Sequence, residues 1–485
     1  MKDKKQNKRI NGGHRLLFFC ILCLFGLYVA VSYAEEQPQR EQSKTKVILL
    51  HTDNLTYDQY RHPGAQILTG NVQFQHDGVL MYCDSACFYE ATNSFDAFGH
   101  VKMVQGDTLD LVGDMLLYNG LDQLARVRHN VVLTHRESKL YTDSLDYDRL
   151  YELGYFFEGG KLVDKDNVLT SDWGQYSPPT RQAVFNYNVK LENPKFTLIS
   201  DTLNYNTLTS MAEIVGPSNI DSGDNHIYSE SGFYNTQTEE AILLDRSIVT
   251  NKGRKMVGDS LYYDSKSGVG EGFRNVVYTD EVNKNMLTGN YCYYNDSTGY
   301  SMATDSAVAI DYSQRDTMYM HADTFKVYTF YMDTDSMYRE VRGYHKVRSY
   351  RMDVQSVCDS LVFDSRDTCI TMYRDPIVWN GGQQVLGEVI KVYLNDSTID
   401  RIHVIDQTLS VDRIDSVHYN QVAGKEMTSY FRDGEMYETW VNGNVYVDYY
   451  MFDDDSLMIG LNYTETTELK LFMKDRKMEK IWMPA

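Results

Sequence analysis

The sequence predicts an all-β fold made of stacked repeats, and the first observation is a short phrase that returns about every 29 residues. The phrase is acid-x-(apolar or x)-x-aromatic-(Asp/Asn). It reads DSLDYD from Asp143, DTLNYN from Asp201, DSLYYD from Asp259 and DSLVFD from Asp359. With the weaker copies at Asp84, Asp114, Asp172 and Glu230, the seven starts from Asp84 to Asp259 are spaced by 30, 29, 29, 29, 29 and 29 residues. Such a fixed period is typical of a repeat architecture.

A second phrase keeps step with the first one. Its copies are GNVQF from Gly70, GHVKM from Gly99, HNVVL from His129, YNVKL from Tyr187 and the looser RNVVY from Arg274. In most of these segments apolar and polar residues alternate, which is the period of a half-buried strand and not of a helix. We therefore expect each repeat to be two or three short strands separated by Gly, Asn and Asp turns. One unit cannot bury its apolar face alone, so neighbouring units must stack.

Composition agrees with an all-β reading. The chain has 39 Tyr and 19 Phe against only 8 Pro among 485 residues, and no helical stripe follows residue 34. Tyr is favoured in strands that have one dry and one wet face, because its ring packs while its hydroxyl stays hydrated.

The amino terminus resembles a secretory signal. Six basic residues and one acidic residue lie within residues 1–34, where an apolar run from Leu16 to Val31 is followed by Ser32-Tyr33-Ala34. This layout predicts a signal peptide over 1–34 with cleavage after Ala34. The alternative is a retained membrane anchor, since sixteen apolar residues are only slightly short of a span.

Charge and cysteine usage exclude two classes. Without residues 1–34 the chain has 41 basic and 67 acidic residues, a formal charge of −26, which argues against binding nucleic acid. Five cysteines remain there, an odd and scattered number that does not form a disulfide framework. Buried, idle thiols are the main expectation, with a Cys358–Cys369 bridge as the alternative.

No catalytic constellation is found, so we expect no enzyme and no cofactor. The twelve histidines are dispersed, and the sequence lacks HExxH, GxSxG, phosphate-loop and Rossmann patterns. His100 and His129 are interpreted as turn residues. The recurring Asp143, Asp201 and Asp259 are interpreted as strand-entry or turn residues, because one carboxylate per repeat falls short of the six to eight oxygens that calcium prefers.

The paired phrases Leu68–Val72, Asp84–Tyr89 and Ala97–Val101 resemble the OstA/LptA organic-solvent-tolerance family of lipopolysaccharide transport proteins. The last third, with NQVAGKEM from Asn420, Gly443-Asn444-Val445 and IGLN from Ile459, resembles the second module of OstA-like proteins. The resemblance implies an elongated β-jellyroll, two facing antiparallel sheets forming an open clasp, that shields acyl chains crossing the periplasm. The expected division is 1–34 signal peptide, 35–50 linker, 51–338 OstA/LptA-like repeat jellyroll and 339–485 second OstA-like β module.

The inward alternating residues are the candidate lining of a lipid groove; the alternative is that they fill a dry core. They are Val72, Phe74, Val101, Met103, Val131, Leu133, Leu145, Tyr147, Val189, Leu191, Leu203, Tyr205, Leu261 and Tyr263.

The resemblance also implies partners and a location. We expect lipopolysaccharide or a related lipid, other jellyroll-type transport proteins joined by edge-strand addition, and an outer-membrane barrel component. The expected location is the periplasm, with association at the outer membrane. Two alternatives stay open: a secreted β-solenoid that binds or cleaves polysaccharide, and a ligand-free scaffold for outer-membrane assembly.

Overall fold

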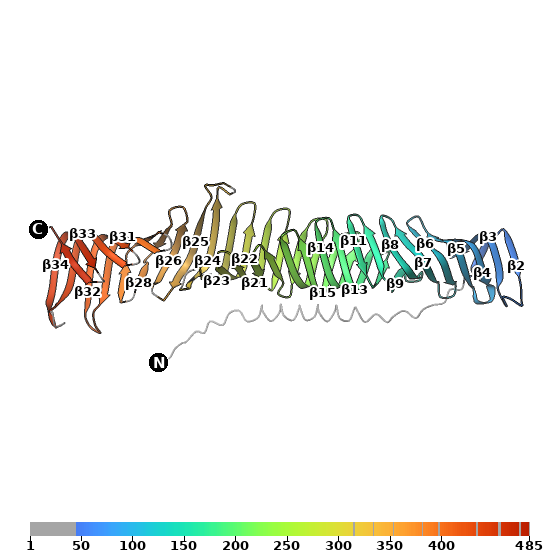
Figure 1. The fold of residues 1–485 in the computed structure, drawn as a ribbon, viewed down its shortest axis with the longest axis horizontal. Coiled ribbons are helices and arrows are strands. Elements are labelled where there is room, and N and C mark those ends of the chain that lie inside the picture. Colours follow the sequence, from blue (N-terminus) through green and yellow to red (C-terminus); the bar gives the residue numbers. More distant parts are fainter. Residues whose placement is uncertain are drawn as a thin grey trace, which may run out of the picture.

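A computed structural model describes residues 45–484, except 314–315, 333, 353, 381, 396–397, 433–434, 454–456 and 475–476. The predicted signal peptide and most of the predicted linker lie outside these residues. The described chain is a long, narrow stack of strands with one short 3-10 helix, η1 (Glu90–Thr92), so the all-β elongated fold is confirmed (Figure 1).

The strands of the first half follow one another in a meander. They are β1 (Ile48–His51), β2 (Asn54–Tyr57), β3 (Gln66–His76), β4 (Val79–Tyr89), β5 (Ser94–Gln105), β6 (Leu109–Asn119), β7 (Leu124–His135), β8 (Ser138–Asp148), β9 (Leu153–Phe156), β10 (Gly160–Asp164), β11 (Asn167–Ser171), β12 (Trp173–Ser177), β13 (Gln182–Asn193), β14 (Phe196–Asn206), β15 (Met211–Ser222), β16 (Asn225–Asn235), β17 (Glu240–Leu244), β18 (Ile248–Asn251), β19 (Arg254–Val257) and β20 (Ser260–Asp264).

The second half continues in the same way with longer strands. They are β21 (Val269–Asp280), β22 (Asn285–Asn295), β23 (Tyr300–Asp311), β24 (Met318–Phe330), β25 (Tyr338–Tyr350), β26 (Val354–Asp364), β27 (Cys369–Tyr373), β28 (Ile377–Asn380), β29 (Gln383–Leu386), β30 (Val389–Asn395), β31 (Thr398–Arg413), β32 (Tyr419–Arg432), β33 (Glu435–Phe452), β34 (Met458–Lys474) and β35 (Lys477–Trp482).

All these strands belong to one hydrogen-bonded sheet, and each pairing between them is antiparallel. In place of the two separate facing sheets that the resemblance implied, the structure has one sheet that folds over on itself into two facing layers. The parallel coil of a β-solenoid is not formed by the described residues. β1 begins at Ile48, inside the predicted linker 35–50. Pairing of β24 with β25 and of β25 with β26 continues across the predicted boundary at residue 339, and that division stays a prediction.

A bend in the middle of each long strand folds the sheet. In β13 the register slips between Asn186 and Val189, where Tyr187 and Asn188 have positive φ. The first half of β13 pairs with β12 and its second half with β11. Such a bulge re-aims a strand. Each strand thereby contributes one half to each of two facing layers, and rings from the two layers meet inside, as in the stacked pair Phe74 and Phe95 at 4.1 Å.

An apolar row runs across the sheet from one strand to the next, and we call it the aliphatic row. Its cross-strand neighbours are Leu49, Phe74, Met81, Met103, Leu111, Leu133, Leu140, Leu162, Leu169, Leu191, Leu198, Ile220, Ile227, Val249 and Met256. Cross-strand side-chain contacts of this kind are the unit of sheet stabilisation. The row therefore joins all the repeats of the first half into one core cluster.

Candidate functional site

The repeated acid lies at the bend of every second long strand. Asp143 and Asp201 stand inside β8 and β14, so the expected strand-entry position is wrong for them, whereas Asp259 directly precedes β20 as expected. Asp53 and five of the repeated acids accept a hydrogen bond from a neighbouring bend: Asn71 to Asp53 (3.0 Å), His100 to Asp84 (2.7 Å), Asn130 to Asp114 (2.7 Å), His129 to Asp143 (3.2 Å), Asn188 to Asp172 (2.7 Å) and Asn275 to Asp259 (2.9 Å). The two repeated phrases are thus partners in one polar ladder along the outside of the fold.

Glycine is required in this ladder at Gly99. Its φ is +75°, which L side chains rarely adopt, and an added Cβ would collide with the carboxylate of Asp84. This close approach explains why a Gly precedes the Asn or His of the second phrase at Gly70 and Gly99.

The fourteen predicted lining residues all face the interior. Four flank the bend in one layer (Val72, Val101, Val131, Val189), four lie in the aliphatic row (Phe74, Met103, Leu133, Leu191), three flank the bend in the other layer (Leu145, Leu203, Leu261), and three are the aromatics of the acid phrase (Tyr147, Tyr205, Tyr263). Thirteen are at most 3% exposed, and Tyr263 is half-buried. In this structure they pack against one another, and their contact with lipid stays a prediction.

The aromatics of the acid phrase form a second row, the tyrosine row, in which large and small residues alternate. In order across the sheet it reads Tyr118, Ala125, Tyr147, Gly154, Tyr176, Ala183, Tyr205, Ala212, Tyr234, Ala241, Tyr263, Gly270 and Tyr294. Each ring lies over a small neighbour, and a Cβ on Gly270 would collide with the ring of Tyr294. This alternation begins at Tyr118, because on the other side of that residue Phe88, Phe95 and Tyr118 are direct cross-strand neighbours.

The turns at the two ends of the bent strands form two rims. The first rim contains the turns at 76–79, 105–109, 135–138, 164–167 and 193–196; the second contains those at 89–94, 119–124, 148–153, 177–182, 206–211 and 235–240. Polar side chains join one rim to the other, and we call this line of contacts the seam.

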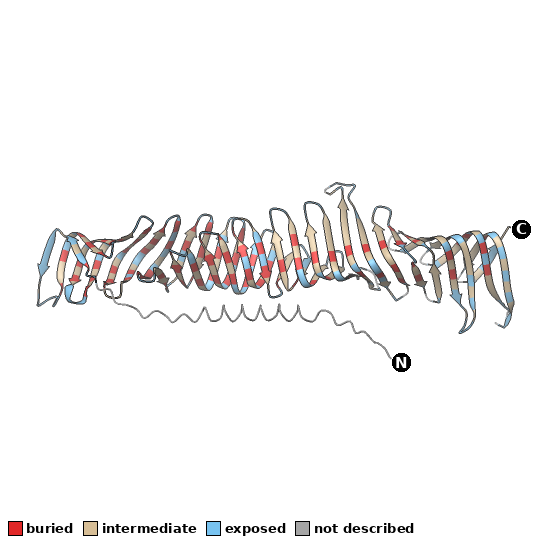
Figure 2. Ribbon diagram, turned by 180° about the vertical axis from the view of Figure 1, so that it is seen from behind, coloured by how far each residue is buried: buried red, intermediate tan, exposed pale blue. Residues whose placement is uncertain are grey.

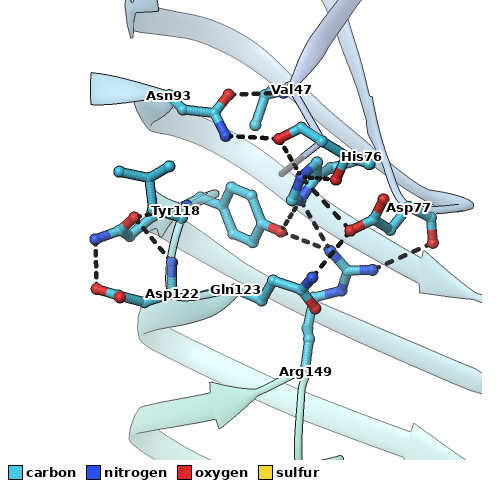
Figure 3. A network of polar contacts seen from close by, with 11 residues as sticks. Val47, His76, Asp77, Asn93, Tyr118, Asp122, Gln123 and Arg149 are labelled. Atoms are coloured by element: carbon cyan, nitrogen blue, oxygen red, sulfur yellow. Dashed lines mark hydrogen bonds and ion pairs between the residues drawn. The ribbon is translucent and has the colours of Figure 1, made fainter. Parts of the chain in front are cut away.

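Figure 3 shows the seam at Tyr118. Arg149 Nη1 donates to the Tyr118 hydroxyl oxygen at 2.6 Å, and this hydroxyl lies 2.7 Å from His76 Nδ1. Arginine cannot accept, so the tyrosine O–H is free to donate to Nδ1, and Nε2–H then faces Thr45, whose Oγ1 is 2.9 Å away. Burial lowers the pKa of His76, with Asp77 acting in the opposite direction, which fits a neutral acceptor at Nδ1. This buried network ties strands β3, β6 and the turn after β8 together.

Further links continue the seam. They are Gln123 to Asp77 (2.9 Å), Gln105 to Glu152 (2.6 Å), His135 with Tyr176 (2.7 Å), Tyr205 to Asp164 (2.8 Å), Lys165 to Ser210 (3.0 Å), Asn167 to Thr236 (2.9 Å) and Lys195 with Glu239. Among the described residues no side-chain hydrogen bond joins the rims between Glu239 and the end of β24. We call the part with the seam, residues 66–264, the closed section.

Beyond the closed section the inward-facing side chains are less fully buried. Apolar residues that continue the two rows there, such as Leu287, Met320, Val341 and Phe363, are only partly buried, although they pack against the second core cluster. Figure 2 shows buried residues concentrated in the closed section and intermediate exposure in most of the strands that follow. We call residues 285–394 the half-exposed section.

Both ends of the sheet present edge strands. At one end β1 and β2 pair only with β3 and expose Ile48, Leu50, Leu55 and Tyr57. At the other end β35 pairs with Lys470–Lys474 of β34. The earlier part of β34 has no partner strand on its outer edge among the described residues. Unpaired edges are templates for strand addition.

The five described cysteines are free thiols, so the alternative of a Cys358–Cys369 bridge is not realised. Burial raises the pKa of Cys83 and of Cys358 to about 12. Cys87 is half-buried. Because the thiolate is the reactive form of cysteine, we expect the Cys87 thiol to be much more reactive than those of Cys83 and Cys358.

We expect iodoacetamide at neutral pH to modify Cys87 well before Cys83, because a pKa of about 12 leaves very little Cys83 thiolate, whereas the less buried Cys87 has its pKa raised to a smaller extent. Mass spectrometry of time points would read this out, with a sample in urea as the control in which all thiols react. Equal labelling of Cys83 and Cys87 in the folded protein would contradict the placement of Cys83.

Among the described residues no group of three or more His, Cys, Asp or Glu is placed to hold a metal ion. In the same part of the chain, no helix is both long and apolar enough to cross a bilayer.

Sequence reasoning missed the residues that make the seam. His76, His135, Arg149 and Asp164 looked like dispersed polar residues, whereas the fold brings each to a tyrosine 31 to 42 residues away in the chain. The available signal was their period, since His76, Gln105, His135 and Asp164 follow one another at 29 or 30 residues.

These features define a class: an elongated antiparallel β protein, bent along its length around one apolar interior and closed over its first half by a polar seam. The model of the family described as OstA-like protein matches residues 44–201 and 196–259. This region of the chain is therefore similar to the OstA-like family, as the repeated phrases predicted. The match ends where the seam ends, and the second module predicted for 339–485 lies outside it. No curated protein matches the chain.

Proposed function

We propose that the protein is a periplasmic carrier that shields the acyl chains of lipopolysaccharide or a related lipid on their way to the outer membrane. The single observation that carries the proposal is the continuous inward apolar face, which is packed shut in the OstA-like region and half-exposed beyond it. Leaving an acyl chain of about twelve carbons in water costs roughly 10 kcal/mol. An apolar protein face that covers the acyl chain removes much of its contact with water.

The half-exposed section is the part of the interior that can accept an acyl chain without first displacing packed side chains. Met320, Val341 and Phe363 would contact such a chain there. In the closed section the predicted lining is reached only when the two layers separate, which requires breaking seam links such as Tyr205 with Asp164. These barriers favour entry of the acyl chain in the half-exposed section first and its passage into the closed section afterwards.

The edge strands support the partner side of the proposal. β1 and β2 at one end and β34 at the other would pair with strands of other jellyroll-type transport proteins or of an outer-membrane barrel component. Such pairing would extend the aliphatic row from one protein into the next.

Site-specific photocrosslinking in the native envelope tests the proposal. The probe is placed at Met320, Val341 and Phe363 in the half-exposed section and at Phe74, Leu145 and Tyr205 in the closed section, with Asn71, Asp146 and Arg342 as outward-facing controls. We expect lipid adducts from the first set at several times the yield of the outward controls. The second set should give weaker adducts because its residues are packed.

Two outcomes would contradict the carrier. One is the absence of any lipid adduct from both inward sets in cells where the variant is folded and exported. The other is equal labelling at inward and outward positions, which would indicate general contact with membrane. Either result would favour the ligand-free scaffold.

A further inference from the structure

An open pocket of about 440 Å³ lies on the seam, between two of its closed positions. Both rims contribute: Gln105, His135 and Arg136 come from the first rim, Glu152 and Arg181 from the second. Tyr147, one of the buried tyrosines of the tyrosine row, also lines it. The pocket therefore connects the surface with the edge of the apolar core.

The repeats explain why the seam is open at this place. At Tyr118 the seam is completed by His76 and Arg149. One repeat later the corresponding residues are Tyr147, Gln105 and Pro178. Pro178 has no side-chain donor to replace that of Arg149, and Gln105 donates to Glu152 instead of contacting the tyrosine. The Tyr147 hydroxyl therefore has no hydrogen-bond partner among the described residues. The next position closes again through His135 and Tyr176.

Two cations at the pocket lack a counter-ion. Neither the Arg136 nor the Arg181 guanidinium forms an ion pair with a described residue, although the whole chain has a net charge of −21. Both arginines line the pocket together with His135. Burial lowers the pKa of His135, and the charges of Arg136 and Arg181 lower it further. The carboxylates nearby are already engaged, since Glu152 accepts from Gln105 and Asp164 accepts from Ser138 and Tyr205.

The pocket also presents acceptors. Gln105 Oε1 is buried without a hydrogen-bond partner, and the Glu152 carboxylate forms part of the wall. Burial raises the pKa of Tyr147, so its hydroxyl stays protonated and can donate. A ligand that fits must accept from two guanidiniums and a phenol while offering at least one proton of its own.

We propose that this pocket binds a phosphate group that retains a proton, either free inorganic phosphate or the phosphomonoester of a lipid headgroup. Arg136, Arg181 and Tyr147 bind its charged oxygens, and its P–OH donates to Gln105 or Glu152. Sulfate has the same shape but carries no proton at neutral pH, so the acceptors on the wall disfavour it. The inference does not rest on the proposed carrier function, because the pocket lies in the closed section and takes a polar group.

Calorimetric titration of the purified chain with inorganic phosphate and, separately, with sulfate at equal ionic strength tests the site. We expect phosphate to bind roughly tenfold or more tightly than sulfate, and R136Q and R181Q each to weaken phosphate binding by roughly tenfold. R274Q is the matched control, since Arg274 is an exposed arginine with the same positive φ as Arg136 and lies far from the pocket. Circular dichroism checks that each variant is folded.

Vesicles separate the two sources of the phosphate. Flotation is measured with phosphatidylcholine vesicles containing phosphatidic acid, a monoester, or phosphatidylglycerol, a diester without a P–OH. Flotation with phosphatidic acid alone, lost in R136Q and R181Q, assigns a lipid headgroup; binding of inorganic phosphate without flotation assigns free phosphate. The proposal is overturned if neither form binds, if sulfate binds as well as phosphate, or if folded R136Q and R181Q bind like the unaltered chain.

Discussion

Replacing Phe95 with alanine is expected to destabilise the strands around β5 by about 3–5 kcal/mol. Phe95 is fully buried, and its ring stacks on Phe74 from the facing layer and lies 5.2 Å from the ring of Tyr118. The deletion leaves a cavity between the two layers that rigid neighbouring strands cannot fill. Hydrogen exchange followed by mass spectrometry would show faster exchange in peptides from β3 to β6, because stability in a stacked array is local.

Phe98 is the matched control for this experiment. It stands three residues further along β5 and is 39% exposed on the outer face. Phe98→Ala should change the local free energy of opening, as measured by hydrogen exchange, by less than about 1 kcal/mol, because surface substitutions usually have small effects. Equal effects of the two substitutions would mean that β5 does not present the two faces described above.

Asp164→Ala is expected to cost about 3 kcal/mol, because it removes an acceptor from two buried hydroxyls. Asp164 accepts from Ser138 Oγ at 2.7 Å and from the Tyr205 hydroxyl at 2.8 Å, which lies across the seam. Each donor left without an acceptor in the dry interior costs about 1–3 kcal/mol. The loss should appear as faster exchange on both rims, in peptides containing Asn167 and Tyr205.

Asp166 supplies the control, since it lies in the same turn but is exposed. Asp166→Ala should leave exchange on both rims unchanged. If Asp164→Ala proved equally silent, the seam would contribute little to holding the layers together, and opening of the closed section would need no specific trigger.

Much of the architecture could be predicted from the sequence because it rests on period and alternation. The spacing of Asp143, Asp201 and Asp259 gave the repeat, and alternation placed residues such as Val72 and Phe74 on one inward face, as the structure has them. The bend could not be predicted in the same way. A strand that bulges at Asn188 has the same alternating pattern on either side as two separate strands joined by a turn.

The seam was beyond sequence reasoning for a different physical reason. Tyr176 and His135 come together only because each strand folds back at its bend, which brings opposite turns close in space. Their residue types alone say nothing of that distance. The small partners of the tyrosine row, such as Ala183 and Gly154, carry no chemical signal at all, although each of them lies between two rings of the row.

The tyrosine row also determines the steps by which the length of the molecule can change. One repeat is a pair of strands, one running toward each rim, and adjacent strands are about 4.8 Å apart, so each 29-residue unit adds roughly 10 Å of reach. Loss of a whole unit in evolution would shorten the molecule and still leave every tyrosine beside a small residue. Loss of a single strand would set Tyr against Tyr and exchange the two rims from that point on. The span that the protein bridges is therefore adjustable only in steps of one hairpin.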